Sequence, residues 1–322
     1  MSAAAGAGRK NGRKQPGPTL AHRAQFYAMR GTIEALRALS WDRGVAIGAK
    51  LGELGYRPLG IRKRVVERQI AAAFPELSPK EVIDLARESY RHLGRSSIEA
   101  ALLGSIGRQR LISLVETVDG WEMLEEALAP GKGVVLVTGH IGNWELGGAY
   151  IAARGVPLDA IGRGMANPLF DAYLTRTREQ MGMTVVHDSE AVRRTPRSLR
   201  AGRAVGFLAD QGVLGLASTF VPFFGRPAKT PRGPAVFALR FGVPVLFVVA
   251  IRKPNGRYRL VIERVEITRT GDKDRDVDAI VARYTELLEK WVRAEPSQYF
   301  WQHRRWKRQP PDTPPELRDP SA

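Results

Sequence analysis

The sequence predicts an α/β protein with a central, mostly parallel sheet that is flanked by helices and preceded by a helical N-terminal region. Between about residues 113 and 295, short apolar runs such as 134–137 and 205–209 alternate with longer stretches of helical spacing. Both runs are followed by polar residues, and open α/β sheets bind their ligands at the carboxyl ends of the strands. A hydrophobic share of 43 % in 322 residues is enough for a sizeable core.

Two regions are expected to precede the sheet. Residues 1–18 contain Ala, Gly, Pro and basic residues but no acid, which predicts a disordered basic tail. Residues 19–112 form the helical region, in which apolar residues recur at helical spacing from 20 to 56 with charged residues between them. The charges argue against a membrane span. An amphipathic helix here would lie on a membrane surface or pack against the domain, and we expect the region to associate with a membrane.

Two further helices are predicted before the sheet. The first begins at 62–64 and ends near Phe74. The second is predicted to run to Arg95, because Ser78 and Glu81 have the spacing of a capping box.

The apolar run 134–137 leads into Thr-Gly-His, and a segment with helical spacing begins at Asn143. This order predicts a strand, a tight turn and a helix start, with His140 in the turn and Glu145 on the first helical turn. In that arrangement the two side chains can meet, and a carboxylate on one ring nitrogen stabilises the imidazolium that forms when the other takes a proton. The pair resembles a general base with its orienting acid. The alternative is a polar strand cap beside a solvated carboxylate at a helix N-terminus.

Glycines on both sides of Ile141 indicate that backbone lies close to a ligand in this turn. Gly139 and Gly142 permit such an approach, and free amide groups at the start of the following helix are suited to holding an oxyanion. Gly142 and Asn143 are therefore candidate oxyanion donors.

Later strand ends supply further candidates. Arg163 follows a strand near 158–161, where a guanidinium is placed to bind a phosphate or an oxyanion, or is a surface residue of a loop. Asp210 follows the strand at 205–209, and its carboxylate would orient an acceptor hydroxyl, hold a metal or cap the next loop. The aromatic segment 220–227 suits an acyl chain that meets a polar head, although a well-packed loop has the same composition.

The rest of the chain is predicted to complete the sheet. Thr230 and Pro231 are placed as N-cap and first residue of a helix that ends near Gly242. Strands are expected at 243–251 and 258–262 with an Asn-Gly turn between them, followed by a helix at 276–294. Aromatic and basic residues alternate at 298–308, and residues 309–322 are a Pro-rich tail.

Composition limits the partners. The formal net charge of +17 favours an anionic partner, and since no nucleic-acid-binding signature is present we expect lipid or an acidic carrier protein and no nucleic acid. There is no cysteine, which excludes thiolate metal sites and a cysteine nucleophile, and no Gly-x-Ser-x-Gly motif. We expect no bound metal or cofactor. The longest uncharged run, 211–225, is too short to span a bilayer.

The segment His140-Ile-Gly-Asn-Trp-Glu145 is similar to the H-x4-D/E motif of the glycerolipid and lipid A acyltransferases. Its Gly-Asn-Trp-Glu form most resembles the late lipid A acyltransferases and their mycobacterial phosphatidylinositol mannoside relatives. Segments at 73–78, 163–168, 210–211 and 301–307 agree with this family in the same order, so the resemblance covers most of residues 30–308.

The resemblance implies that residues 113–308 form an acyltransferase core. His140, oriented by Glu145, would remove the proton of an acceptor hydroxyl, which attacks the thioester of acyl carrier protein or coenzyme A. Arg163 would assist the oxyanion donors, and Asn167, Arg178 and Asp210 would line the site. The acceptor would be an anionic lipid, with a lipid A precursor ahead of a lysophospholipid or glycolipid, on the cytoplasmic face of a bacterial inner membrane. A lipid ester hydrolase and a basic binding module remain as alternatives.

Overall fold

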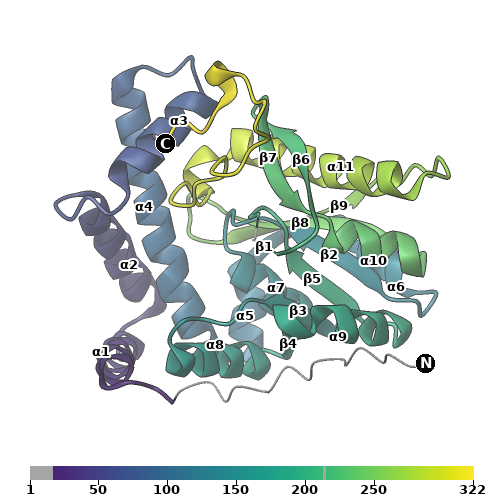
Figure 1. The fold of residues 1–322 in the computed structure, drawn as a ribbon. Coiled ribbons are helices and arrows are strands. Elements are labelled where there is room, and N and C mark those ends of the chain that lie inside the picture. The colour runs from purple at the N-terminus through teal and green to yellow at the C-terminus, as the bar shows by residue number, and fades with distance from the viewer. Residues whose placement is uncertain (1–16, 213–214) are drawn as a thin grey trace, which may run out of the picture.

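A seven-stranded sheet forms the centre of the computed structural model, which describes residues 17–212 and 215–322. Most of the predicted basic tail, residues 1–16, lies outside the described residues. The strand order is β1-β9-β8-β2-β5-β3-β4, and every neighbouring pair is parallel except β8 and β9. The predicted mostly parallel α/β sheet is therefore confirmed (Figure 1). The strands are β1 (Val115–Asp119), β2 (Val134–Thr138), β3 (Leu158–Gly162), β4 (Met183–His187), β5 (Ala204–Leu208), β8 (Val245–Arg252) and β9 (Tyr258–Val265).

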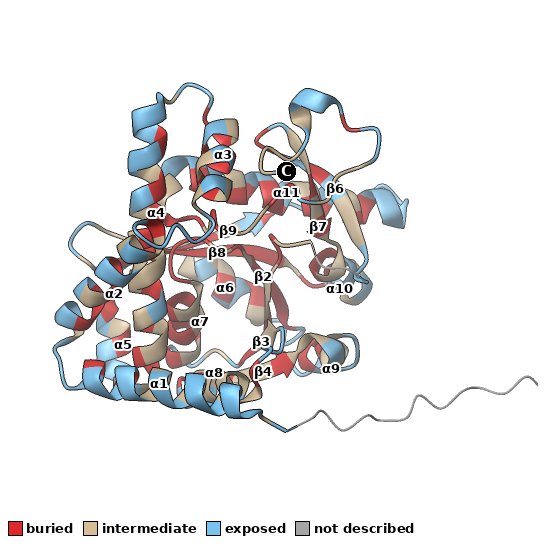
Figure 2. Ribbon diagram, turned by 60° about the vertical axis from the view of Figure 1, so that its left-hand side comes forward, coloured by how far each residue is buried: buried red, intermediate tan, exposed pale blue. Residues whose placement is uncertain are grey.

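The two faces of the sheet are buried in two separate clusters of apolar side chains. In β2, Val134 and Leu136 pack on one side and Val135 and Val137 on the other, as the alternation of side chains along a strand requires. One face carries α5 (Arg108–Leu114), α6 (Trp121–Leu128) and α7 (Trp144–Ala153). The other carries α10 (Gly233–Phe241) and α11 (Lys273–Ala294). Figure 2 shows the resulting buried centre. The helices α8 (Pro168–Gln180) and α9 (Asp188–Arg200) follow β3 and β4.

The first four helices stand at one side of the sheet (Figure 1). They are α1 (Leu20–Arg37), α2 (Trp41–Tyr56), α3 (Lys63–Ala73) and α4 (Pro79–Leu102), which a short 3-10 helix, η1 (Leu103–Ser105), follows. The helical spacing from 20 to 56 covers two helices. The first, α1, ends at Arg37, and α2 begins after its N-cap, Ser40. The capping box of Ser78 and Glu81 is confirmed, but α4 continues beyond Arg95 to Leu102.

Glycines allow α2 and α4 to pack in close contact. A Cβ atom at Gly52 would overlap the carbonyl oxygen of Tyr90, and one at Gly94 would overlap that of Gly48. This contact joins α2 to α4, and residues in the second half of α4 form hydrogen bonds with the turn after β2.

Segment 220–227 belongs to an antiparallel hairpin of β6 (Ser218–Phe223) and β7 (Arg226–Pro231). Phe223 and Phe224 are buried against Trp301 and Trp306, so the packing interpretation of this segment holds and it does not line the apolar cavity described below. The predicted helix start at Thr230 is wrong, because pairing with Thr219 keeps Thr230 extended in β7. The helix α10 begins at Gly233 instead.

The C-terminal segment is part of the folded body. Trp301 and Trp306 are fully buried, and the side chain of Gln69 donates to the carbonyl oxygens of Trp301 (2.7 Å) and His303 (2.9 Å). Residues 309–322 return to α3, as Figure 1 shows, and include the 3-10 helix η3 (Pro315–Leu317); a further one, η2 (Pro296–Gln298), precedes Trp301. None of the helices in the described ranges is long and apolar enough to cross a membrane.

Candidate active site

The turn between β2 and α7 presents His140 at the carboxyl end of a central strand. Gly142 has φ +61°, and a Cβ atom there would overlap the carbonyl oxygen of Ala250, so the turn requires glycine at this position. Asn143 ends the turn, and its side chain accepts a hydrogen bond from Leu146 N (3.0 Å) as the N-cap of α7. The strand, turn and helix predicted for this segment are confirmed.

Asp210 is the carboxylate that holds the histidine. The Nδ1 atom of His140 lies 2.6 Å from Asp210 Oδ1, and the backbone N–H of His140 donates to Oδ2 (3.0 Å). A neutral imidazole that donates through Nδ1 has its free lone pair on Nε2, so Nε2 is the nitrogen able to accept a proton. The Trp144 and Phe300 rings flank the imidazole, with centroid distances of 4.9 and 5.8 Å.

The charge of Asp210 is stabilised in spite of its burial. Burial alone raises the pKa of this carboxyl, but the charge of His140 in its protonated form, the two hydrogen bonds from His140 and the nearby Arg305 outweigh it and lower the pKa to about 2. Asp210 is therefore ionised at neutral pH and able to stabilise an imidazolium.

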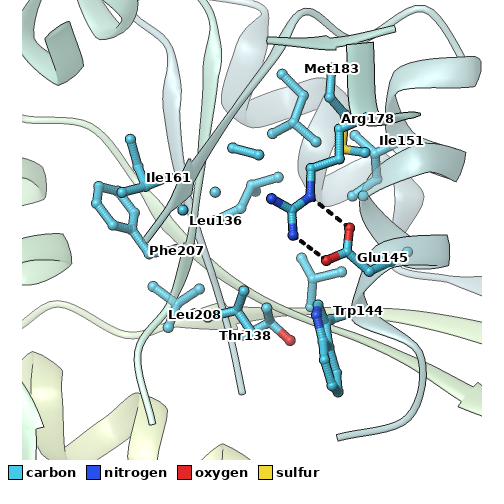
Figure 3. A pocket seen from close by; sticks show the side chains of 18 of the residues that line it. Leu136, Thr138, Trp144, Glu145, Ile151, Ile161, Arg178, Met183, Phe207 and Leu208 are labelled. Carbon is cyan, nitrogen blue, oxygen red and sulfur yellow. Dashed lines mark hydrogen bonds and ion pairs between the residues drawn. The ribbon is translucent and has the colours of Figure 1, made fainter. Parts of the chain in front are cut away.

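Glu145 has a different partner from the one predicted. Its carboxylate accepts two hydrogen bonds from Arg178 of α8, one from Nε (2.9 Å) and one from Nη2 (2.5 Å), as Figure 3 shows. The predicted His140–Glu145 pair is thus wrong for this structure, because Arg178 reaches Glu145 while Asp210 occupies Nδ1 of the histidine. The strand-end pattern placed Asp210 in the site, but it did not reveal the contact with His140, since 70 residues separate the two.

The predicted oxyanion donors are already engaged. The amide of Gly142 donates to Gln298 O (3.0 Å) and the amide of Asn143 to Ala250 O (2.9 Å), so neither is free for a substrate oxygen. Asn167 is the N-cap of α8, and its side chain donates a hydrogen bond to the carbonyl oxygen of His22 (3.0 Å) in α1. Asn167 therefore has a structural role, because it connects α1 with α8. Arg163 is exposed and lines a cavity beside the histidine.

A buried polar network behind the turn was not predicted. Glu99 of α4 is fully buried and accepts hydrogen bonds from Arg252, Tyr258 and Asn143 Nδ2, the last at 2.9 Å. His92 lies earlier on the same face of α4, and its Nε2 donates a hydrogen bond to Gly142 O (3.0 Å). Burial lowers the pKa of His92 to about 4, so the ring is neutral at physiological pH.

The sequence does carry a signal for this network. Ser89, His92, Ser96 and Glu99 recur at intervals of three and four residues, and all four are buried. A polar stripe at helical spacing on the face that a helix buries indicates partners in the interior.

An apolar cavity of about 100 Å³ begins beside the turn. Thr138, Trp144 and the Glu145–Arg178 pair form one part of its wall, and residues of β2, β3, β4, β5, β8 and α7 form the rest (Figure 3). The apolar side chains among them include Leu136, Ile151, Ala160, Ile161, Met183, Phe207 and Leu208. Within the described ranges, no three His, Asp or Glu side chains converge as metal ligands do.

The histidine lies at the carboxyl ends of the strands of a mostly parallel sheet, beside a buried carboxylate and an apolar cavity. This arrangement is that of an α/β enzyme site suited to general base chemistry on an apolar substrate. The model of the bacterial lipid A biosynthesis acyltransferases matches residues 16–308. The chain therefore belongs to this family and is an acyltransferase, as the H-x4-E motif indicated.

Characterised relatives agree with this assignment. The lipid A biosynthesis lauroyltransferase of Escherichia coli (strain K12) is 27% identical over 83% of this chain and 86% of its own length. The palmitoleoyltransferase of the same organism is 27% identical over 82% and 85%. A phosphatidylinositol mannoside acyltransferase of Mycobacterium tuberculosis (strain ATCC 25618 / H37Rv) is 28% identical over 70% of each chain. These similarities support an enzyme that acylates lipid A or a related lipid.

Proposed function

We propose that the protein transfers a fatty acyl group from the thioester of acyl carrier protein or coenzyme A to a hydroxyl of an anionic lipid, with His140 as the general base. The acceptor is a lipid A precursor, as the names of the E. coli relatives suggest; a lysophospholipid or a glycolipid, such as the mycobacterial relative's name suggests, is the second candidate. The observation that carries this proposal is the 2.6 Å contact between His140 and Asp210.

The chemistry needs no covalent acyl-enzyme. Nε2 of His140 removes the proton of the acceptor hydroxyl as its oxygen attacks the thioester carbonyl, and Asp210 stabilises the imidazolium that forms. The tetrahedral intermediate collapses with cleavage of the carbon–sulfur bond, and the imidazolium returns its proton to the leaving thiolate. Ester and free thiol are the products, and the histidine is again neutral.

The apolar cavity is the proposed site of the fatty acyl chain. Its wall is mostly hydrocarbon, and it begins at Thr138 and Trp144, on either side of the His140 turn. An acyl chain inserted there would place its carbonyl carbon near the histidine. Burial of the chain would contribute to donor binding in proportion to the apolar area removed from water.

The helical N-terminal region is proposed to bind the cytoplasmic face of a bacterial inner membrane peripherally. Leu51, Leu54, Leu59 and Ile61 are exposed on the end of α2 and the segment after it. Arg57, Arg62 and Arg64 are exposed in the same stretch. Apolar side chains beside cations are the composition of a surface that inserts among anionic headgroups.

Single-turnover transfer from a labelled acyl carrier protein to a panel of lipid acceptors in detergent micelles tests the proposal. Wild type is compared with His140→Ala and Asp210→Ala, and each variant is checked for an unchanged melting curve. Transfer to one acceptor that is lost in both folded variants supports the mechanism and names the acceptor. Release of free fatty acid without any acylated lipid supports the hydrolase instead, and transfer by His140→Ala at the wild-type rate excludes His140 as the base.

A further inference from the structure

A second cavity, of about 240 Å³, lies beside the catalytic turn and is strongly basic. Gln211 connects it to the site, because this residue lines the cavity and its Nε2 atom lies 3.2 Å from His140 Nδ1. Among the residues that the structure describes, no acidic one lines the cavity. The cations that line it are Arg163, Lys229, Arg304, Arg305, Lys307 and Arg308.

The positive charge of this cavity is largely unneutralised. Among the described residues, only Arg304 of the six has a carboxylate partner, Asp319. Other arginines near the protein's surface do have carboxylate partners, such as Arg193 with Glu190 and Arg259 with Asp119. Like charges gathered without counterions repel each other, so such a cluster is stabilised by an anion from solution.

Arg305 is a buried and rigidly held member of the cavity wall, unlike a cation on a mobile surface side chain. It is 3 % exposed, and its two Nη atoms donate to Lys229 O and Thr230 Oγ1, both at 2.7 Å. Its buried Nε has no hydrogen-bond partner in the described ranges 17–212 and 215–322. A guanidinium that is held rigidly at the wall of a cation-lined cavity supplies a fixed positive charge, which is suited to an oxygen-rich anion.

We propose that this cavity binds a phosphate group of a substrate while acyl transfer takes place at His140. The inference rests on the proposed function and makes it more specific. Arg163, Lys229 and Lys307 would contact the phosphate oxygens, and the rigid Arg305 would hold the cluster in place. The phosphate belongs to the lipid acceptor or to the phosphopantetheine arm that both candidate donors share. In either case, binding of the phosphate in the cavity would fix the position of the substrate relative to His140.

Direct binding tests this site without turnover. We would titrate the full chain calorimetrically with a short-chain phosphatidic acid below its critical micelle concentration, and with coenzyme A. The neutral diacylglycerol of the same chain length and pantetheine, which lack the phosphates, are the reference ligands. The variants are Lys229→Gln and Lys307→Gln. Lys132→Gln removes the same charge from an exposed lysine before the amino end of β2, at the opposite edge of the sheet.

Loss of one charge-assisted contact is expected to weaken phosphate binding about tenfold, with Lys132→Gln equal to wild type. Weaker binding of phosphatidic acid alone assigns the cavity to the acceptor, and weaker binding of coenzyme A alone assigns it to the donor; either supports the site. The proposed phosphate site is overturned if both cavity variants bind the two phosphate ligands as tightly as Lys132→Gln does. Weaker binding of anionic vesicles by these variants would not rescue it, because vesicle binding reports on the membrane surface alone. A protein that binds phosphate but transfers no acyl group would refute the proposed function and leave the site standing.

Discussion

Nδ1 of His140 lies 2.6 Å from Oδ1 of Asp210, although the two residues are 70 positions apart and belong to the ends of two adjacent parallel strands, β2 and β5. Parallel pairing aligns Thr138 with Leu208, so the residues two positions further along each strand come out side by side. The neighbour in sequence, Glu145, contacts Arg178 instead. This distribution of carboxylates leads to the first two predictions.

Asp210→Asn is expected to lower the rate of acyl transfer by about 10²–10⁴-fold, because the amide lacks the charge that stabilises the imidazolium of His140. Single-turnover rates and melting curves measure the effect. The change is nearly isosteric, so a folded variant is expected. Wild-type rates in folded Asp210→Asn would show that the histidine works without this carboxylate.

Glu145→Gln is expected to act mainly on stability. It leaves the largely buried guanidinium of Arg178 without its carboxylate, which costs roughly 2–3 kcal/mol of the free energy of unfolding, below the 3–5 kcal/mol of a fully buried pair. Urea unfolding of Glu145→Gln, Arg178→Gln and the double variant gives the coupling energy between the two side chains. Additive effects of the two single changes would contradict the pairing.

Glu99→Gln is expected to destabilise the protein by about 3–5 kcal/mol, because the buried Arg252 loses its counter-charge. Where the variant remains folded, its maximal rate should fall more than its donor affinity, since Glu99 also holds Asn143 at the end of the turn that carries His140. Glu88→Gln on the same helix is the matched control. Glu88 is a half-exposed ion-pair partner of Arg95, so its loss should cost less than about 1 kcal/mol.

His92 predicts a pH dependence of stability. Its pKa in the folded protein is about 4 against 6.5 for the free side chain, so the unfolded chain binds more protons between these values. The contribution of a neutral His92 to stability is complete above about pH 6.5 and is lost as the pH falls towards 4, by about 2 kcal/mol at pH 5. The free energy of unfolding of His92→Gln relative to wild type should therefore shift in favour of the variant between pH 7 and pH 5. Parallel curves for the two proteins would refute this.

Ala160→Leu tests the assignment of the apolar cavity to the acyl chain. Ala160 lines the cavity from β3 and is half-buried, so a larger side chain there takes volume from the ligand without replacing a fully packed core residue. We expect kcat/KM for the longest donors to fall at least about tenfold while shorter donors are used as before. A uniform loss over all chain lengths would place the acyl chain elsewhere.

The local order of residues determined much of this protein. Apolar runs and helical spacing predicted the mostly parallel sheet, and the sequence around His140 predicted a strand, a turn and a helix N-cap, because these depend on neighbours within a few residues. The motif from His140 to Glu145 also indicated the acyltransferase family. Local pattern failed where pairing between distant segments overrode it, as at Thr230, which the hairpin keeps extended.

Only the tertiary structure decided which groups meet. It joined His140 to Asp210 and Glu145 to Arg178, it occupied the amides of Gly142 and Asn143 with carbonyl acceptors, and it turned the polar stripe of α4 into a support for the turn after β2. A hydrogen bond depends on a separation of about 3 Å in space, and spacing along the chain limits that separation only for near neighbours. The register of β2 against β5 brings His140 and Asp210 within that distance.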